Sequence, residues 1–149
     1  MILILPLSLS PSPSLKDAGL KLFKNIVFDE VKADVVKAML VVIDTEREGG
    51  EVDRDLLRQC VEVFDAMGMG TLEVYVSDFE DHLLVSTREY YSRKSQFYLH
   101  TDDTPSYMIK AEAALDAERE RVHAYVGESF LNYIHCTVWR DSHVYIHIH

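Results

Sequence analysis

Residues 43–70 read IDTEREGGEVDRDLLRQCVEVFDAMGMG, and they hold the end of one helix, a turn and a complete second helix. Gly49-Gly50 ends the first of these, since glycine readily takes the left-handed conformation that closes a helix. Asp53 is the predicted N-cap of the second, because its carboxylate can accept from the free backbone N–H groups. Gly68 is its predicted end. Its apolar stripe has helical spacing: Leu56, Leu57, Cys60, Val61, Phe64 and Met67.

Long amphipathic helices are predicted on both sides of this stretch. The helix before it covers residues 16–47, with an inward face of Leu20, Phe23, Val27, Val31, Val35, Ala38, Met39 and Val42. A third helix covers residues 71–99, with Leu72, Tyr75, Val76, Phe79, Leu83, Tyr90 and Phe97 facing inward. After a polar turn at 100–103, a fourth helix begins with Thr104 as its cap and Pro105 in its first position. Its stripe is Met108, Ala111, Leu115, Val122 and Val126, and Gly127 is its predicted stop.

The composition is that of an acidic globular chain. Of 149 residues, 48% are apolar and 27% are charged, which excludes collagen-like, low-complexity and disulfide-scaffold classes. The net charge of −10 makes nucleic acid an unfavourable partner. Cys60 and Cys136 form no CxxC motif, so we expect a reduced, intracellular protein. No stretch approaches the ~20 apolar residues of a membrane helix, and no membrane partner is predicted.

The predicted fold class is all-α: an elongated bundle of long amphipathic helices with irregular ends. We expect a disordered leader over residues 1–14, a helical domain over 15–126 and an irregular His-rich tail over 127–149. The leader begins with apolar residues, but it lacks a basic residue before Lys16 and Pro6 interrupts the apolar run. A secretory signal is therefore not expected.

The tail holds a cluster of metal-ligand side chains, namely His135, Cys136, His143, His147 and His149. One interpretation is a zinc or nickel site, since imidazole and thiolate suit both ions. The alternative is accidental His enrichment. We favour the alternative, because a structural zinc site needs four ligands at ordered spacing and no CxxC or HxxxH partner occurs upstream. No metal and no cofactor are predicted.

Other candidate sites have structural interpretations that we favour. Gly68-Met69-Gly70 lacks the length of a phosphate loop and is interpreted as a turn between helices. Cys60 lies on an apolar stripe and is expected to be a buried thiol, not a nucleophile. The doublet Tyr90-Tyr91 is expected to pack, with Ser92-Arg93-Lys94 as a basic edge, rather than to be a regulatory site. The acids Asp78, Glu80, Asp81, Asp116, Glu118 and Glu120 are expected on solvated helix faces, with Asp116–Arg119 and Glu118–Arg121 as i,i+3 pairs. No catalytic residue is predicted.

Four blocks in order carry a resemblance to a known family. They are the run at 43–70, YVSDFEDHLL at 75–84, TREYYSRKSQFYL at 87–99 and SYMIKAEAALDAERERVHAYV at 106–126. Together they resemble the N-terminal helical region of cullins, especially those of Skp–cullin–F-box ubiquitin ligases. The resemblance covers residues 15–126 and is similar mainly to the second cullin repeat. EYYSRKS followed by YMxKxE…ERERV is its most specific part.

The resemblance implies one five-helix cullin repeat of a curved stalk, and a scaffold instead of an enzyme. In cullins the N-terminal tip binds a substrate-receptor adaptor, and the C-terminal domain binds a RING protein and carries a lysine that accepts a ubiquitin-like modifier. Neither the first repeat nor the C-terminal domain is matched, so no such residue is assigned here. The expected setting is the ubiquitin ligase complex and ubiquitin-dependent protein catabolism, in cytoplasm and nucleus.

Two other functions stay open. The chain is alternatively a generic helical protein-interaction module, or a non-functional truncated cullin remnant whose ends come from outside the cullin coding sequence. A metal-dependent enzyme centred on the tail is a third hypothesis. Because a solenoid repeat buries its faces against neighbouring repeats, we also expect exposed apolar stripes and self-association.

Overall fold

The computed structural model describes residues 14–126, which fold into helices without any strand. The first helical rod is continuous: α1 (Leu15–Phe23), the π-helical turn η1 (Lys24–Phe28) and α2 (Asp29–Arg47). Next comes α3 (Arg54–Gly68). The third stretch joins α4 (Glu73–Tyr75), the π-helical turn η2 (Val76–Glu80) and α5 (Asp81–Thr101), and α6 (Thr104–Tyr125) is the last. The predicted all-α class and its four helical stretches are confirmed.

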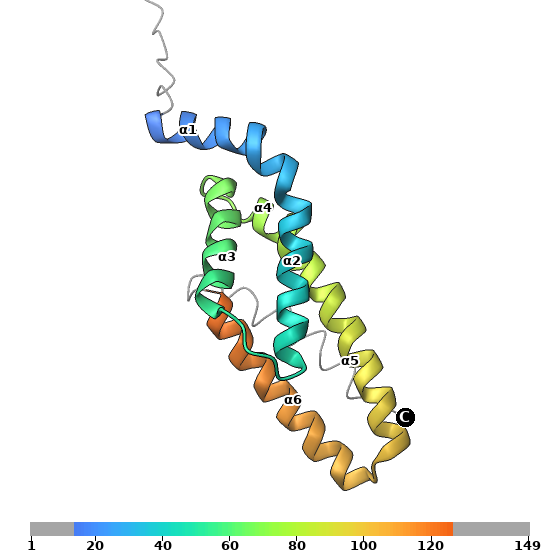
Figure 1. The fold of residues 1–149 in the computed structure, drawn as a ribbon. Coiled ribbons are helices and arrows are strands. Elements are labelled where there is room, and N and C mark those ends of the chain that lie inside the picture. Colours follow the sequence, from blue (N-terminus) through green and yellow to red (C-terminus); the bar gives the residue numbers. More distant parts are fainter. Residues whose placement is uncertain (1–13, 127–149) are drawn as a thin grey trace, which may run out of the picture.

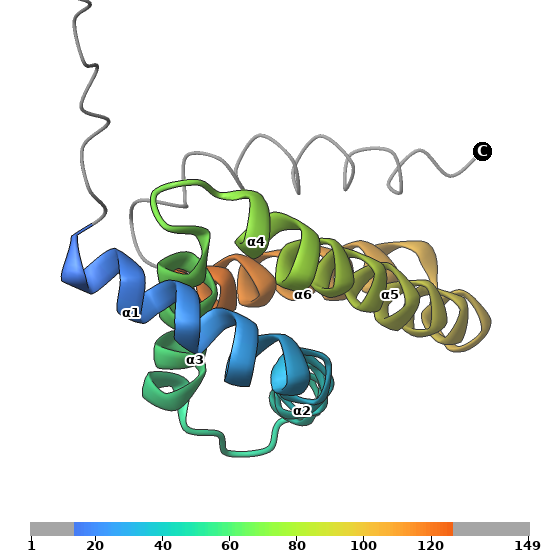
Figure 2. The ribbon, with the colours of Figure 1, turned by 90° about the horizontal axis from the view of Figure 1, so that it is seen from above.

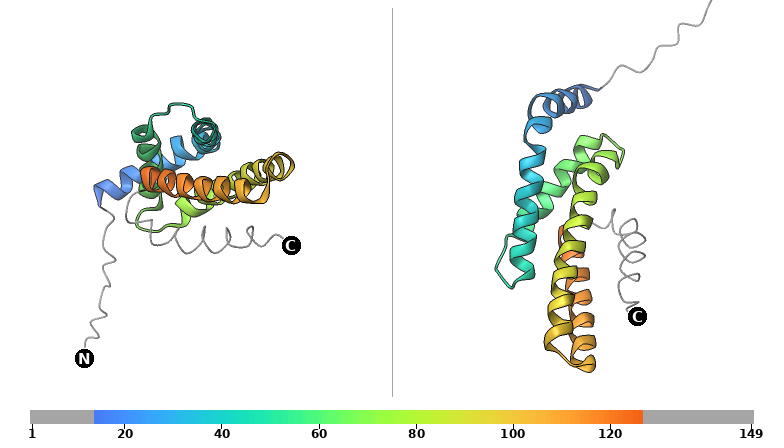
Figure 3. Two further views of the ribbon diagram at one scale, coloured as in Figure 1. Left: turned by 90° about the horizontal axis from the view of Figure 1, so that it is seen from below. Right: turned by 90° about the vertical axis from the view of Figure 1, so that its right-hand side faces the viewer.

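The helices alternate in direction and form an elongated bundle. In Figure 1, α2 and α5 run downward, α3 and α6 return upward, and α1 crosses the top. Seen from above, α5 and α6 lie side by side as one hairpin, and α2 and α3 lie together on one side of it (Figure 2). The tip of that hairpin extends beyond the loop that joins α2 to α3 (Figure 3). None of the helices within residues 14–126 has the length and hydrophobicity to cross a membrane.

The helix ends follow the predicted capping chemistry in most places. The carboxylate of Asp53 accepts a 2.9 Å hydrogen bond from the backbone N–H of Leu56, and Gly49 has the left-handed φ of 88°. Ser14, placed in the leader by the sequence, caps α1: its hydroxyl accepts from the N–H of Asp17 at 3.1 Å. The rest of the leader, Gly127 and the tail lie outside the described residues.

One helix end differs from the prediction. The α6 cap is Asp103 and not Thr104, because the Asp103 carboxylate accepts from the N–H of Ser106 at 3.2 Å. Aspartate is as good an N-cap residue as threonine, and Asp103 has the extended backbone that an N-cap needs. The end of α3 agrees with the prediction: the helix ends at Gly68, and the next residue, Met69, takes the left-handed conformation with φ 51°.

The buried face of the first rod also differs from the prediction. Its fully buried apolar residues are Phe28, Val36, Met39 and Ile43, whereas Phe23, Val27 and Val31 are exposed. The turn η1 is the physical reason, because a π-helical turn holds more residues than an α-turn and so rotates the stripe between α1 and α2. Only Leu20, Val35, Met39 and Val42 of the predicted face contact the core.

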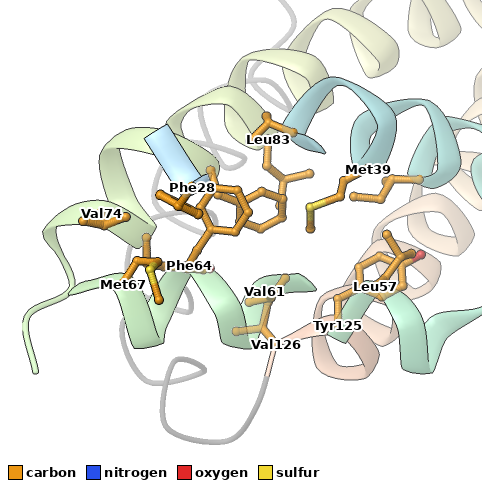
Figure 4. Packing of buried hydrophobic residues seen from close by; sticks show 14 residues of the cluster. Phe28, Met39, Leu57, Val61, Phe64, Met67, Val74, Leu83, Tyr125 and Val126 are labelled. Carbon is orange, nitrogen blue, oxygen red and sulfur yellow. The ribbon is translucent and has the colours of Figure 1, made fainter. Parts of the chain in front are cut away.

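The core is an aromatic cluster at the upper end of the bundle, where α3, η1 and η2 meet. Phe64 lies at its centre, with its ring centroid 5.1 Å from that of Phe28 and 5.7 Å from that of Phe79. Tyr75 continues the cluster 5.8 Å from Phe79. Figure 4 shows Phe28 and Phe64 between Val74 and Leu83, with their ring planes at 75° to each other, and Val61 and Val126 below them. Residues from every helical stretch therefore share one core.

Several residues predicted to face inward are exposed. Phe97 and Met108 lie toward the tip of the α5–α6 hairpin, which extends beyond α2 and α3. These two helices therefore do not cover them, and both side chains are exposed. Leu56 and Leu72 are likewise exposed. The predicted stripes are thus correct for the residues in the core cluster and wrong at the periphery of the bundle.

We expect Phe64→Ala to destabilise the fold by about 3–5 kcal/mol, because it removes a buried ring from two aromatic contacts and leaves a cavity. Urea denaturation followed by circular dichroism measures this loss. The matched control is Leu56→Ala, two turns earlier on α3 and 56% exposed, which should change stability by no more than about 0.5 kcal/mol. Equal losses in the two variants would contradict the central position of Phe64.

Candidate functional site

The most elaborate polar site joins α2, α5 and α6 around the side chain of Arg47. The Arg47 side chain has no exposed area, although it lies in the last turn of α2. Its Nε donates to Glu118 Oε2 at 3.2 Å, and Nη2 donates to the other carboxylate oxygen of Glu118. Nη1 donates to Asp44 at 2.9 Å and Nη2 donates to the Thr87 hydroxyl at 2.6 Å. The fork of the guanidinium thus binds one carboxylate with two bonds, the geometry that gives Arg pairs their specificity.

Two tyrosines of α5 complete the cage around Arg47. The guanidinium carbon lies 5.2 Å from the ring centroid of Tyr90 and 5.8 Å from that of Tyr91. Tyr90 donates from its hydroxyl to the backbone carbonyl of Arg47 at 3.2 Å, and Tyr91 donates to Glu118 at 2.8 Å. The prediction that this doublet packs is therefore confirmed. Lys94 forms the expected basic edge, 3.2 Å from Glu48.

Burial and charge set the protonation states of this network. Burial opposes ionisation of Glu118, but hydrogen bonds from Arg47 and its charge outweigh it, so the pKa of this carboxyl lies below its ordinary value of 4.5. Burial, then the charge of Glu118, raise the pKa of Tyr91. The pair is therefore an ionised couple with a neutral phenol beside it.

A second group of polar contacts extends the site to α3. Glu46 accepts from Arg54 Nε at 2.8 Å and also from the hydroxyl of Tyr125. Arg54 reaches Glu120 at 3.3 Å, and Arg121 reaches Glu118 at 2.9 Å. The end of α2, the start of α3 and the end of α6 are thereby tied together. We call Arg47, Glu118, Tyr91, Glu46 and Arg54 with these partners the clamp.

The sequence did not single out Arg47 as a functional residue. A signal was present, because Arg47 follows Ile43 by four residues and so continues the buried register of Met39 and Ile43. An arginine in an apolar register indicates a buried ion pair. Its partner Glu118 was expected on a solvated face, and its position in the interior corrects that expectation.

The other candidate residues are scattered over the bundle. Gly68-Met69-Gly70 forms the predicted turn. Cys60 is partly buried against the core, and burial raises the pKa of its thiol. The Asp116–Arg119 pair forms as predicted at 2.9 Å, and Asp78 pairs with Lys32 at 2.8 Å. His135, Cys136, His143, His147 and His149 lie outside the described residues, and residues 14–126 contain no metal-binding group of three or more His, Cys, Asp or Glu.

Glu80 does not lie on a solvated face as predicted, because the turn η2 carries it into the interior. Only 3% of the residue is exposed, and its Oε1 has no hydrogen-bond partner within residues 14–126. Burial, together with the nearby charge of Asp81, raises the pKa of this carboxyl above 4.5. Glu80 is therefore a strained point in the fold, since a buried acceptor without a partner is costly.

A shallow groove of about 230 Å³ lies between α2 and the η2–α5 segment. Its floor is apolar and its rim carries the Lys32–Asp78 ion pair together with Lys37 and His82. Small-molecule sites have volumes of roughly 300–1,000 Å³, so the groove suits a side chain of a protein partner better than a substrate. The described residues therefore form a helical bundle with a shallow groove between α2 and the η2–α5 segment.

We expect Arg47→Met to destabilise the fold by about 3–5 kcal/mol, because it leaves the Glu118 carboxylate buried without its partner. The double variant Arg47→Met/Glu118→Leu should recover part of this loss, since it removes both charges. Urea denaturation measures both. As a control, Arg58→Met removes an exposed pair with Asp55 and should cost less than about 1 kcal/mol. A double variant no more stable than Arg47→Met alone would contradict a buried pair.

We expect Glu80→Gln to stabilise the fold at pH 7, by on the order of 1 kcal/mol, because it removes a buried charge. Since the folded-state pKa is raised, this cost is absent below the ordinary pKa and appears as the pH rises through the folded value. The stability difference between variant and wild type should therefore shrink as the pH falls from 7 to about 4. Thermal melting across this range measures it, and a difference independent of pH would refute the assignment.

Comparisons with known proteins agree with this geometry. The family model of the cullin alpha solenoid domain matches residues 8–140. That match begins before residue 15 and ends beyond residue 126, so the resemblance inferred from the sequence blocks was drawn too narrowly at both ends. The division into leader, domain and tail stays a prediction.

Plant and other cullins are among the relatives. Putative cullin-like protein 2 of Arabidopsis thaliana is 41% identical over 116 residues, which cover 78% of this chain and 31% of the relative. Cullin-1 of Oryza sativa subsp. japonica is 42% identical over 117 residues, covering 78% of this chain and 16% of that protein. Cullin-2 of Arabidopsis thaliana is 38% identical over 125 residues, covering 84% and 16%. The chain thus spans less than half the length of these relatives, and the helices, their order and the match over most of its length show that it belongs to the cullin family.

Proposed function

We propose that this chain is a non-catalytic scaffold segment of a cullin-type ubiquitin ligase complex, with a part in ubiquitin-dependent protein catabolism. The observation that carries the proposal is the clamp in a chain of the cullin family. Arg47 and Glu118 join helices from both halves of the described sequence through a buried ion pair. A support that sets the spacing of its partners needs such rigidity more than it needs a pocket.

Partner contacts are expected on exposed apolar side chains. These gather on the first rod and at the tip of the α5–α6 hairpin, where Phe97, Leu99, Met108 and Ile109 are exposed. A cluster of this kind on a soluble surface is typical of a protein-interaction site. We propose contacts with ligase subunits at the hairpin tip and self-association through the other apolar face, in the cytoplasm and the nucleus.

We expect the tagged chain, expressed in cells of its source, to co-purify with ligase subunits such as a Skp-type adaptor or a RING protein. Phe97→Gln/Ile109→Gln should reduce their recovery at least tenfold, on the order of 1.4 kcal/mol, because it removes the apolar contact at the hairpin tip. Quantitative mass spectrometry of the eluates measures this, with Leu56→Gln as the control for an exposed apolar residue elsewhere.

A generic helical interaction module is the second candidate, favoured by the same exposed side chains. Recovery of specific partners without any ligase subunit would replace the first proposal by this one. Recovery of no partner by the folded wild type would leave only the non-functional remnant.

A further inference from the structure

The first rod carries an apolar strip on the side that faces away from the core. Leu22 is 62% exposed and Ile26 is 66% exposed, and neither belongs to the buried cluster. Figure 1 shows why: α1 crosses the top of the bundle and projects beyond α3. We call the strip the first-helix face. It consists of Leu15, Leu22, Phe23, Ile26, Val27 and Val31.

The turn η1 makes this face continuous. Leu22 and Ile26 are four residues apart, as are Phe23 and Val27, so two apolar rows run from α1 into η1. The second row continues to Val31 in α2. The core contacts of the same rod come from other positions, Leu20 and Phe28. The six side chains expose on the order of 600 Å², at the upper end of the ~300–600 Å² of the largest apolar patch on a typical monomer.

The charges beside this face change sign along the rod. Residues 15–28 hold three lysines, Lys16, Lys21 and Lys24, and one acid, Asp17, which is engaged in the helix cap. Residues 29–34 hold Asp29, Glu30 and Asp34 against the single Lys32. Lys16, Lys21, Glu30 and Asp34 are exposed, and no ion pair within residues 14–126 engages them. Two such rods attract each other only when they lie antiparallel, basic half against acidic half.

We propose that a second copy of this chain covers the first-helix face, with the two rods antiparallel about a two-fold axis near residues 23–27. This inference rests on the self-association proposed above and commits it to one face. A standard interface buries about 800 Å² of each partner, and the apolar strip alone exposes on the order of 600 Å² of this. In a two-fold interface, residue i of one copy contacts residue j of the other, and residue j contacts residue i in turn. Lys16 and Lys21 of each copy therefore meet Asp34 and Glu30 of the other.

The first experiment is sedimentation velocity of the full chain from about 1 to 100 µM, a range suited to interfaces of this size. We expect a monomer–dimer equilibrium in the wild type. Leu22→Gln/Ile26→Gln should weaken it at least tenfold, and its thermal unfolding when dilute should match that of the wild-type monomer, because both side chains lie outside the core. The matched control, Ile109→Gln at the hairpin tip, should leave the dimer unchanged.

The second experiment reverses charges on each half of the rod. Lys16→Glu/Lys21→Glu and Glu30→Lys/Asp34→Lys should each dimerise at least tenfold more weakly alone. An equimolar mixture of the two should recover dimerisation as a heterodimer, because each then meets its opposite charge. The wild-type dimer should weaken as salt rises from about 50 to 500 mM, because these charges lie at the rim of the interface.

Three results would overturn the proposal. A wild-type chain that stays monomeric throughout the range shows that no second copy covers the face, and self-association as a whole fails. A dimer lost with Ile109→Gln and kept with Leu22→Gln/Ile26→Gln moves the contact to the hairpin tip. A dimer that the charge reversals leave intact, with no gain on mixing, excludes the antiparallel arrangement.

Discussion

The fold depends on the buried ion pair between Arg47 and Glu118. Removing two charges from water costs several kcal/mol for each ion, and only good geometry with further hydrogen bonds offsets that cost. Here Asp44, Thr87 and the two tyrosines supply those bonds and faces. The arrangement tolerates little displacement, because a small slide of α6 along α2 would strand both charges. The pair therefore fixes the register of these helices more than it adds net stability.

The polar clamp and the apolar core meet at Tyr125 but act differently. Around Phe64 the packing is apolar and non-directional, so similar shapes could replace it. Around Arg47 the contacts are hydrogen bonds, which are directional and require specific partner groups. A bundle joined by both kinds of contact holds its helices in one relative arrangement.

Much of the fold could be predicted from the sequence, and the site much less. The helices were predicted from the 3.6-residue period of their apolar residues. The start of α3 was predicted from Asp53, and the end of α2 from Gly49. The π-helical turns left no compositional signal, so the rotated face of the first rod was missed. The exposure of Phe97 and Met108 depends on how far neighbouring helices reach, which no local pattern states. Arg47 and Glu118 are 71 residues apart, and their pairing exists only in the folded chain.

The π-helical turns also bear on how this fold accommodates changes in chain length. Each of η1 and η2 accommodates a residue that a regular α-helix of the same rise would not include. Loss of one residue within η1 would restore regular helix without breaking the rod. Because η1 already fits the extra residue into nearly the rise and rotation of a regular turn, its loss would leave α1 and α2 in nearly the same relative orientation. A single deletion there would therefore shorten the chain while the core and the outer surface both stayed in place.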